Sequence, residues 1–277
     1  MEHSNKSNST LQPQMLSFES KDGAKLNYSK LGHGPGLVIL PGANCSSQNY
    51  RSLAERLGAH YTVCVIDRRG RNGSAPQGVD YSMQKECEDA MALLANTKSA
   101  FLFGHSYGGV IALNVARQYP LTKGAVYEPP VGEVPIEWLS DFEQALEKKD
   151  FISAQVILMK GLRLGGLLNW VPKPLLTRMF RSLKEDELAD MTKNLTTVPR
   201  EVREVQKLES KSDQYAQIKV EMLLLAGSKS PAYLRQATHI LEMILAHSKK
   251  QVFPGLDHLA PMDVPGKIAL ALQEFFR

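Results

Sequence analysis

The stretch Ser99-Ala-Phe-Leu-Phe-Gly-His-Ser-Tyr-Gly-Gly-Val110 says more about the fold than any other part of the chain. At its centre, two glycines flank Ser106 in a Gly-x-Ser-x-Gly pattern, which lets a strand reverse sharply into a helix and leaves the serine hydroxyl exposed. The apolar run 100–103 is typical of a buried strand, and the run 110–119 has helical spacing. We therefore expect a strand, a tight turn and a helix, with Ser106 placed where a base can take its proton. The alternative is a glycine-rich loop with a buried serine.

Outward from this turn, short apolar runs alternate with segments of helical spacing. This alternation predicts an α/β protein with a mostly parallel, doubly wound sheet covered on both faces. Sites in such sheets lie beyond the carboxyl ends of the strands. Strands are expected at 15–18, 25–31, 36–40, 61–66, 100–103, 123–128, 220–226 and 250–253, and helices at 50–57, 82–95, 110–119, 232–246 and 264–276.

The alternation stops after Pro130, where a long segment contains helical patterns and no evident strand. The segment either packs on the main domain or, as we expect, forms a lid whose inner face lines an apolar pocket. Trp138, Leu162 and Trp170 are the residues expected to contact a substrate there. Helices are expected in this segment at 136–149, 151–164, 174–183, 185–195 and 200–208. We therefore expect three parts of the chain: a disordered tail (1–14), a core (15–130 and 214–277) and a helical lid between the sixth and seventh strands (131–213).

Composition argues against several classes of function. The 277 residues carry a net charge of +4 with dispersed basic residues, so no nucleic-acid partner is expected. No apolar run approaches the length of a membrane span, and Cys45, Cys64 and Cys87 are too few and too scattered for a disulfide framework or a zinc site. Residues 1–14 lack the apolar core of a signal peptide. We therefore expect a cytoplasmic protein that acts on a small molecule, with its oligomeric state left open.

A serine nucleophile needs a base, and histidine is the usual one. His258 stands in Pro254-Gly-Leu-Asp-His-Leu-Ala-Pro261, a loop directly after the last expected strand, from which it can reach the serine turn. We expect His258 to be the base, and the alternative is a surface-loop histidine without that role. The remaining histidines lie near the start of the chain, before strands, inside the turn or on a helix: His3, His33, His60, His105, His239 and His247.

Taken together, these motifs resemble the α/β-hydrolase superfamily. The resemblance rests on Pro41-Gly42 after a strand, on Asp67-Arg-Arg-Gly-Arg-Asn-Gly-Ser74, on the Gly-x-Ser-x-Gly turn and on the Gly255-x-x-His258 loop. It covers residues 15–277, with the lid segment the least similar part. The resemblance implies the α/β-hydrolase fold and says little about the substrate.

The resemblance also implies an oxyanion hole, built from two backbone N–H groups. Ala43, in the turn after the third strand, would supply one, and Tyr107, the residue after the nucleophile, would supply the other. Asn44 is a further candidate. Two such donors stabilise a developing oxyanion by several kcal/mol.

The acid departs from the common pattern of the superfamily. Its members usually carry Asp after the seventh strand, where this chain has Ser230. Some relatives, certain lactone-cleaving enzymes among them, place the acid after the sixth strand, where this chain has Glu128. Glu128 is therefore the expected acid, with Asp257, another carboxylate or no acid as the alternatives. Asp67 is expected to brace its loop through hydrogen bonds.

The expected function is a serine hydrolase that cleaves a carboxylic ester or lactone of a fairly apolar small molecule, with no cofactor and no metal. Ser106 would attack the carbonyl carbon, His258 would move the proton and Glu128 would orient His258. Two alternatives remain open: the same fold used as a lyase or cofactor-free oxygenase, and a noncatalytic ligand receptor.

Overall fold

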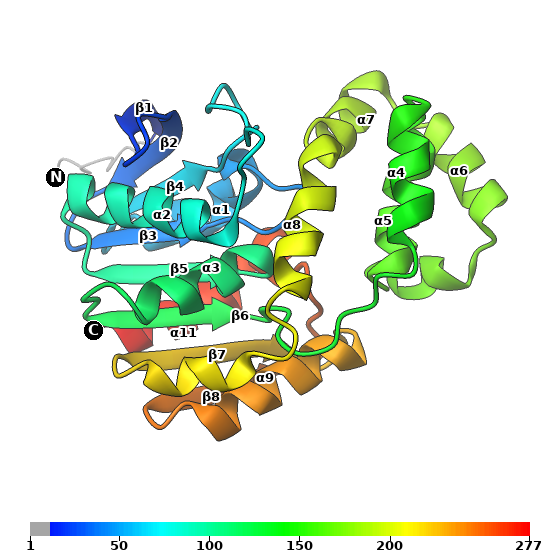
Figure 1. Cartoon of the computed structure of the whole chain (residues 1–277). Coiled ribbons are helices and arrows are strands. Elements are labelled where there is room, and N and C mark those ends of the chain that lie inside the picture. The colour runs from blue at the N-terminus through cyan, green and yellow to red at the C-terminus, as the bar shows by residue number, and fades with distance from the viewer. Residues whose placement is uncertain (1–11) are drawn as a thin grey trace, which may run out of the picture.

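The computed structural model describes residues 12–277, so most of the expected tail lies outside the described residues. Eight strands form one sheet in the order β1-β2-β4-β3-β5-β6-β7-β8 (Figure 1). The pairs β1–β2 and β2–β4 are antiparallel and the other neighbours are parallel. The predicted sheet is therefore confirmed. Its strands are β1 Gln14–Glu19, β2 Lys25–Gly32, β3 Gly36–Leu40, β4 Thr62–Asp67, β5 Phe101–His105, β6 Lys123–Tyr127, β7 Glu221–Gly227 and β8 Ser248–Phe253.

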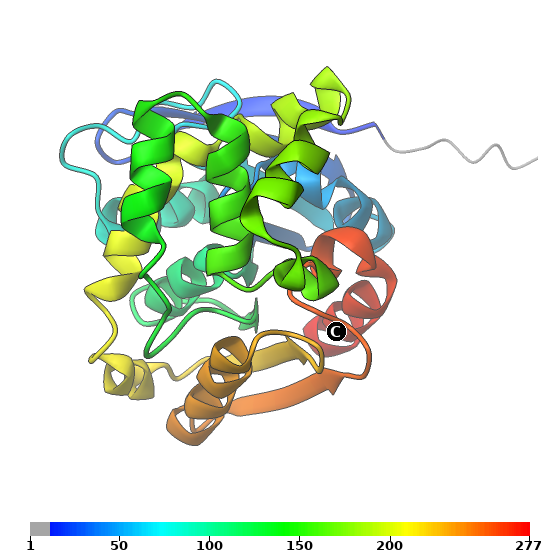
Figure 2. The same cartoon turned by 90° about the vertical axis from the view of Figure 1, so that its right-hand side faces the viewer.

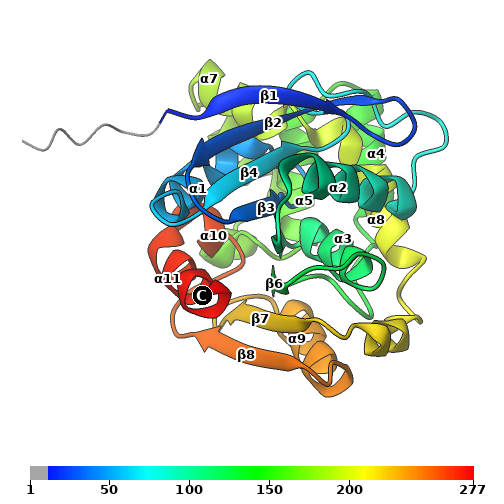
Figure 3. The same ribbon diagram turned by 90° about the vertical axis from the view of Figure 1, so that its left-hand side faces the viewer.

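Helices cover both faces of this sheet (Figure 3). In β3, Leu37 and Ile39 belong to the apolar cluster beneath α1 and α11, whereas Val38 and Leu40 belong to the cluster beneath α2, α3 and α9. Because alternate residues of a strand point to opposite faces, a strand covered on both sides needs an unbroken apolar run. These helices are α1 Arg51–Leu57, α2 Met83–Thr97, α3 Tyr107–Ala116, α9 Ala232–Ile244 and α11 Pro265–Phe276.

Between β6 and β7 the chain forms helices and 3₁₀ turns, which we call the helical insert. Figures 1 and 2 show the insert beyond the carboxyl ends of the strands. The insert has an apolar core of its own, and its helix α8 (Val198–Gln206) also contacts α2 and α3 of the main domain. The role of a lid remains a prediction. The insert consists of α4 Leu139–Glu147, α5 Phe151–Gly161, η2 Gly166–Trp170, α6 Lys173–Arg181, α7 Glu185–Thr192, η3 Leu195–Thr197, α8 Val198–Gln206 and η4 Ser212–Gln217.

Two short elements lie near the carboxyl ends of the strands, η1 Ser47–Tyr50 after β3 and α10 Ala260–Asp263 after β8. Neither these nor the other helices within residues 12–277 combine the length and apolar character that crossing a membrane requires.

Candidate active site

Ser106 lies in a turn between β5 and α3 that only small neighbours allow. Its backbone has a φ of 54° and a ψ of −122°, and non-glycine residues rarely adopt a positive φ. A Cβ on Gly104 would lie 2.3 Å from the Gly108 carbonyl oxygen, and a Cβ on Gly108 would lie 2.1 Å from the Leu40 carbonyl oxygen. Close backbone packing therefore requires both glycines, for the reason that the sequence pattern suggested.

Glu128 and His258 form a buried hydrogen bond near this turn. Glu128 directly follows β6 with a φ of 47°, and its side chain has no solvent exposure. Its Oε1 accepts the Gly227 N–H at 2.7 Å, and its Oε2 lies 2.7 Å from His258 Nδ1. An ionised carboxylate only accepts hydrogen bonds, so Nδ1 carries the hydrogen and a neutral ring keeps a lone pair on Nε2.

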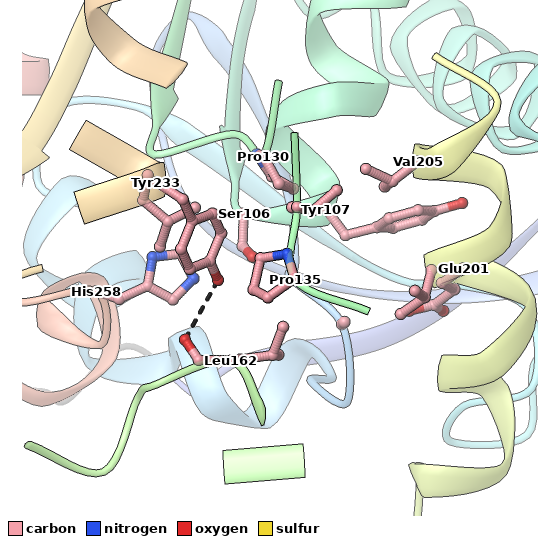
Figure 4. Close-up of a pocket in the computed structure, with 13 residues that line it drawn as sticks. Ser106, Tyr107, Pro130, Pro135, Leu162, Glu201, Val205, Tyr233 and His258 are labelled. Atoms are coloured by element: carbon pink, nitrogen blue, oxygen red, sulfur yellow. Dashed lines mark hydrogen bonds between the residues drawn. The ribbon is translucent and has the colours of Figure 1, made fainter. Parts of the chain in front are cut away.

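Ser106 and His258 line the same cavity, which we call the inner cavity (Figure 4). Within the described chain no hydrogen bond joins the Ser106 hydroxyl to the His258 ring. Catalytic hydrogen bonds of ligand-free enzymes are often long and tighten when substrate binds. A second, outer cavity shares both residues and extends toward α5 and α7. The lining of the inner cavity is mostly apolar, and its apolar residues include Pro130, Val134, Pro135, Leu162, Val205 and Leu234.

Ala43 and Tyr107, the two residues expected to supply backbone N–H groups to an oxyanion hole, both lie beside Ser106 at the inner cavity. Ala43 lies in the loop after β3, and Tyr107 is the first residue of α3. Neither N–H donates a hydrogen bond within residues 12–277, and both residues line the inner cavity. The first N–H groups of a helix have no partner within it and carry the positive end of its dipole.

Asn44, the further candidate for this position, connects the same loop to the helical insert. Its Nδ2 donates to Gln155 Oε1 on α5 at 3.2 Å and to the Met191 carbonyl oxygen on α7 at 3.0 Å. Its carbonyl oxygen accepts a hydrogen bond from Asn194 Nδ2 at 3.3 Å. The Asn44 side chain therefore joins the loop to the insert, and a contribution to an oxyanion hole remains a prediction.

His105 lies behind Ser106 and joins the loop after β3 to the loop of His258. Burial, and then the proximity of His258, hold the pKa of His105 well below its usual range, so its ring is neutral at pH 7. His105 Nε2 lies 2.9 Å from the His258 carbonyl oxygen, so Nε2 donates and Nδ1 accepts. Tyr50 Oη, 2.5 Å from Nδ1, donates to it and accepts the Gly42 N–H at 3.0 Å. From the sequence we had expected only that His105 lies inside the serine turn.

The other acids considered from the sequence lie away from the His258 ring or form other bonds. Asp257 is exposed, and its Oδ1 accepts the Leu259 N–H at 3.0 Å. Ser230, where the usual acid would stand, is buried, and its hydroxyl has no partner among the described residues.

Asp67 braces two loops. Its Oδ1 accepts the Ser47 N–H at 2.7 Å and Asn72 Nδ2 at 2.9 Å, and its Oδ2 accepts the Ser47 hydroxyl at 2.9 Å. Burial raises its pKa. Arg69 is paired nearby, with Asp89 at 2.7 Å. These bonds are those of a structural residue, as the sequence suggested.

Only one of the three residues expected to contact substrate lies at a cavity. Leu162 lines both the inner and the outer cavity. Trp138 is packed in the core of the insert, where its ring meets Phe142 edge-on, and Trp170 is 87% exposed. Neither tryptophan lines the inner or the outer cavity, so we do not include them in the proposed contact set. An apolar segment supplies side chains both to its own core and to any pocket that it lines. Its composition does not show which of the two a given apolar side chain contacts.

A buried charge network beside the inner cavity was not predicted from the sequence. We define it as Arg68, Arg71, Glu86 and Glu201. Arg68 Nη1 lies 2.9 Å from Glu86 Oε1 and 3.0 Å from Glu201 Oε1, and Arg71 Nη2 lies 2.6 Å from the same Glu201 oxygen. The network joins α8 of the insert to the loop after β4. The one sign of this network in the sequence was a run of arginines directly after a buried strand. That run does not show which carboxylates pair with the arginines.

The comparisons with known proteins agree with the fold. A model described as "Alpha/beta hydrolase family" matches residues 37–271. Among solved structures, an alpha/beta hydrolase from Sphaerobacter thermophilus DSM 20745 is similar, with a TM-score of 0.80, 27% sequence identity, and coverage of 95% of this chain and 100% of that chain.

Two curated proteins are similar in sequence. Pimeloyl-[acyl-carrier protein] methyl ester esterase from Xanthomonas axonopodis pv. citri (strain 306) is 24% identical over 262 residues, which are 90% of this chain and 98% of that protein. Uncharacterized hydrolase YraK from Bacillus subtilis (strain 168) is 34% identical over 102 residues, and the match covers 35% of this chain and only 38% of that protein.

Proposed function

The chain belongs to the α/β hydrolase family, and on this premise we propose that it is a serine hydrolase that cleaves a carboxylic ester or lactone of a fairly apolar small molecule. Relatives named as hydrolases and esterases support hydrolysis as the class of reaction. The observation that carries the proposal is the 2.7 Å contact between Glu128 Oε2 and His258 Nδ1, on a histidine that shares a cavity with Ser106.

In the proposed reaction, Ser106 Oγ attacks the carbonyl carbon while His258 Nε2 takes its proton. The carbonyl oxygen becomes an oxyanion, which the N–H groups of Ala43 and Tyr107 stabilise. His258 then returns the proton to the leaving alcohol, and the acyl group stays on Ser106. Water, activated by the same histidine, releases the acid. Glu128 accepts the hydrogen bond from His258 Nδ1–H throughout the reaction and stabilises the imidazolium that forms.

The two cavities suggest how a substrate would lie. The inner cavity has a volume of about 50 Å³ and the outer cavity about 350 Å³. Since both include Ser106 and Leu162, we propose that a small group on one side of the ester enters the inner cavity while the other side extends into the outer one. The helical insert would act as a lid that sets the size of both groups. The cytoplasmic location remains a prediction.

The test compares wild type with Ser106→Ala on short methyl and p-nitrophenyl esters and on small lactones. We expect ester turnover to fall by several orders of magnitude because the nucleophile is lost, while circular dichroism shows an unchanged fold. A fluorophosphonate probe should label the wild type and leave the variant unlabelled. Equal turnover by the folded variant would reject the proposal and favour an activity in which the serine only binds substrate.

A further inference from the structure

One ionised group stands out in the mostly apolar inner cavity. Glu201, on α8, lines this cavity together with Ser106 and His258 (Figure 4). Its side chain has no solvent exposure. Arg68 and Arg71 hold the pKa of Glu201 below its usual range even though burial acts to raise it, so the side chain is a carboxylate.

The two oxygens of Glu201 differ. Oε1 accepts hydrogen bonds from both Arg68 and Arg71, at 3.0 and 2.6 Å. Oε2 is buried and has no partner among the described residues. A buried acceptor without a partner costs free energy, and such atoms are rare in folded proteins. Arg71 Nε also lacks a partner, but Arg71 does not line the cavity.

The two tyrosines that line the cavity already use their hydroxyl hydrogens. Tyr233 donates to the Leu162 carbonyl oxygen at 3.3 Å (Figure 4). Tyr81 donates to Glu86 Oε1 at 2.7 Å, so the Tyr107 hydroxyl, 2.9 Å from Tyr81, donates to Tyr81. Neither tyrosine offers its hydrogen to Glu201. The unmet requirement in this cavity is therefore a donor for Glu201 Oε2.

We propose that Glu201 Oε2 accepts a hydrogen bond from a hydroxyl or N–H group on the part of the substrate that fills the inner cavity. The proposal rests on the proposed function, because it assigns that cavity to one side of the ester that Ser106 attacks. It narrows the substrate class to small esters or lactones that carry a hydrogen-bond donor on an otherwise apolar group.

The charge and the volume of the inner cavity further limit which substrate group could donate this hydrogen bond. The two arginines of the buried charge network offset its two carboxylates, so the cavity offers little net negative charge to a cationic group. One water molecule needs roughly 10–15 Å³ of such volume, so about 50 Å³ admits a group of only a few heavy atoms. A short acyl chain with one neutral hydroxyl fits both limits.

The first test uses the wild-type protein and methyl esters matched in shape. Methyl 3-hydroxybutanoate and methyl 6-hydroxyheptanoate place a hydroxyl at two depths. Methyl 3-methylbutanoate and methyl 6-methylheptanoate carry a methyl group instead, and methyl 3-oxobutanoate and methyl 6-oxoheptanoate carry an acceptor. We expect kcat/KM for a hydroxy ester to exceed that of its methyl partner by about tenfold, since a hydrogen bond to a charged group is involved. The oxo ester should be the poorest of its set, because two acceptors would face each other.

The second test is Glu201→Gln. Arg68 and Arg71 can donate only to the amide oxygen, so the amide NH₂ would take the place of Oε2 and turn the acceptor into a donor. The preference should then reverse, with the oxo ester ahead of the hydroxy ester. Glu86→Gln is the matched control, because it removes a carboxylate from the same network at a residue that does not line the cavity. It should leave the ratio of hydroxy to methyl ester at the wild-type value.

The outcomes are distinct. Wild type that cleaves the methyl esters with no preference for the hydroxyl, or with a preference for the oxo esters, overturns this inference and leaves the proposed function standing. A Glu201→Gln variant that slows every ester by one common factor shows that Glu201 only braces α8, and it also overturns the inference. Wild type that cleaves no ester of the panel and resists the fluorophosphonate probe rejects the proposed function itself. The wild-type comparison holds even if the variant does not fold.

Discussion

Two residues of the proposed catalytic set have backbones that non-glycine residues rarely adopt, Ser106 with a φ of 54° and Glu128 with a φ of 47°. Each such residue costs roughly 1–3 kcal/mol, so it persists only where the surrounding structure holds it. Here both residues directly follow parallel strands, Ser106 after β5 and Glu128 after β6. These two backbone conformations at adjacent strand ends place the proposed nucleophile and the proposed acid near His258.

His105 gives a prediction about pH. Its pKa in the folded protein is depressed, whereas in the unfolded chain it has the ordinary value of about 6.5. The unfolded state therefore binds the extra proton first, so the contribution of His105 to stability is complete above pH 6.5 and is lost as the pH falls. The free energy of unfolding should therefore be lower at pH 5.5 than at pH 7.5, by at most about 1.4 kcal/mol from this residue.

The measurement is urea unfolding at both pH values for wild type and His105→Gln, whose amide can still donate to the His258 carbonyl oxygen. Between pH 7.5 and 5.5, the free energy of unfolding should decrease less in the variant than in wild type. His247→Asn, at an exposed position, is the control and should keep the wild-type dependence. Identical pH dependence in wild type and His105→Gln would contradict a neutral, buried His105.

At the scale of elements, two of the ties between the helical insert and the main domain lie beside the proposed site. Asn44 bonds to α5 and α7, and Glu201 of α8 pairs with Arg68 and Arg71. Leu162, which follows α5, lines both cavities between these two ties. The size of the cavities should therefore depend on this residue more than on the exposed surface of the insert.

We predict that Leu162→Ala shifts the preference among acyl esters toward bulkier groups. Removing the branched end of Leu162 enlarges the cavities. The value of kcat/KM for an ester with one or two additional carbons should therefore rise about tenfold relative to that of the shortest ester. The measurement is kcat/KM over a series of p-nitrophenyl esters. Leu175→Ala, on α6 and 53% exposed, is the control. A uniform change across the series would show that Leu162 does not set size.

Strands, helices and the strand–turn–helix around Ser106 could be predicted because they depend on local patterns: apolar runs, helical spacing and paired glycines. The position of Trp138 could not, because spacing does not say whether an apolar side chain meets the core of the insert or the cavity. Glu201 was missed for a related reason. Its pairing with Arg68 joins residues 133 positions apart, and only the folded chain shows which carboxylate an arginine meets.

At the scale of the whole molecule, sheet topology brings together residues that are far apart in the chain. Ser106, Glu128 and His258 follow β5, β6 and β8, and the order β5-β6-β7-β8 places these strand ends along one edge. The loop after β8 reaches back past β7 to meet Glu128, which also accepts the N–H of Gly227 at the end of β7. Glu128 therefore contacts the end of β7, the strand after which Ser230 holds the position expected for the usual acid.

The most direct test of this arrangement is kcat/KM for a short ester in Glu128→Gln, compared with Asp257→Asn and Ser230→Ala. If Glu128 orients His258 and stabilises its imidazolium, Glu128→Gln should lose roughly 10³–10⁴-fold in kcat/KM, while the other two variants keep most of the activity. Placing Asp at position 230 in the Glu128→Gln background should recover part of the rate, because it rebuilds the commoner layout. A folded Glu128→Gln protein with wild-type kcat/KM, or a comparable loss in Asp257→Asn, would contradict the assignment of Glu128 as the acid.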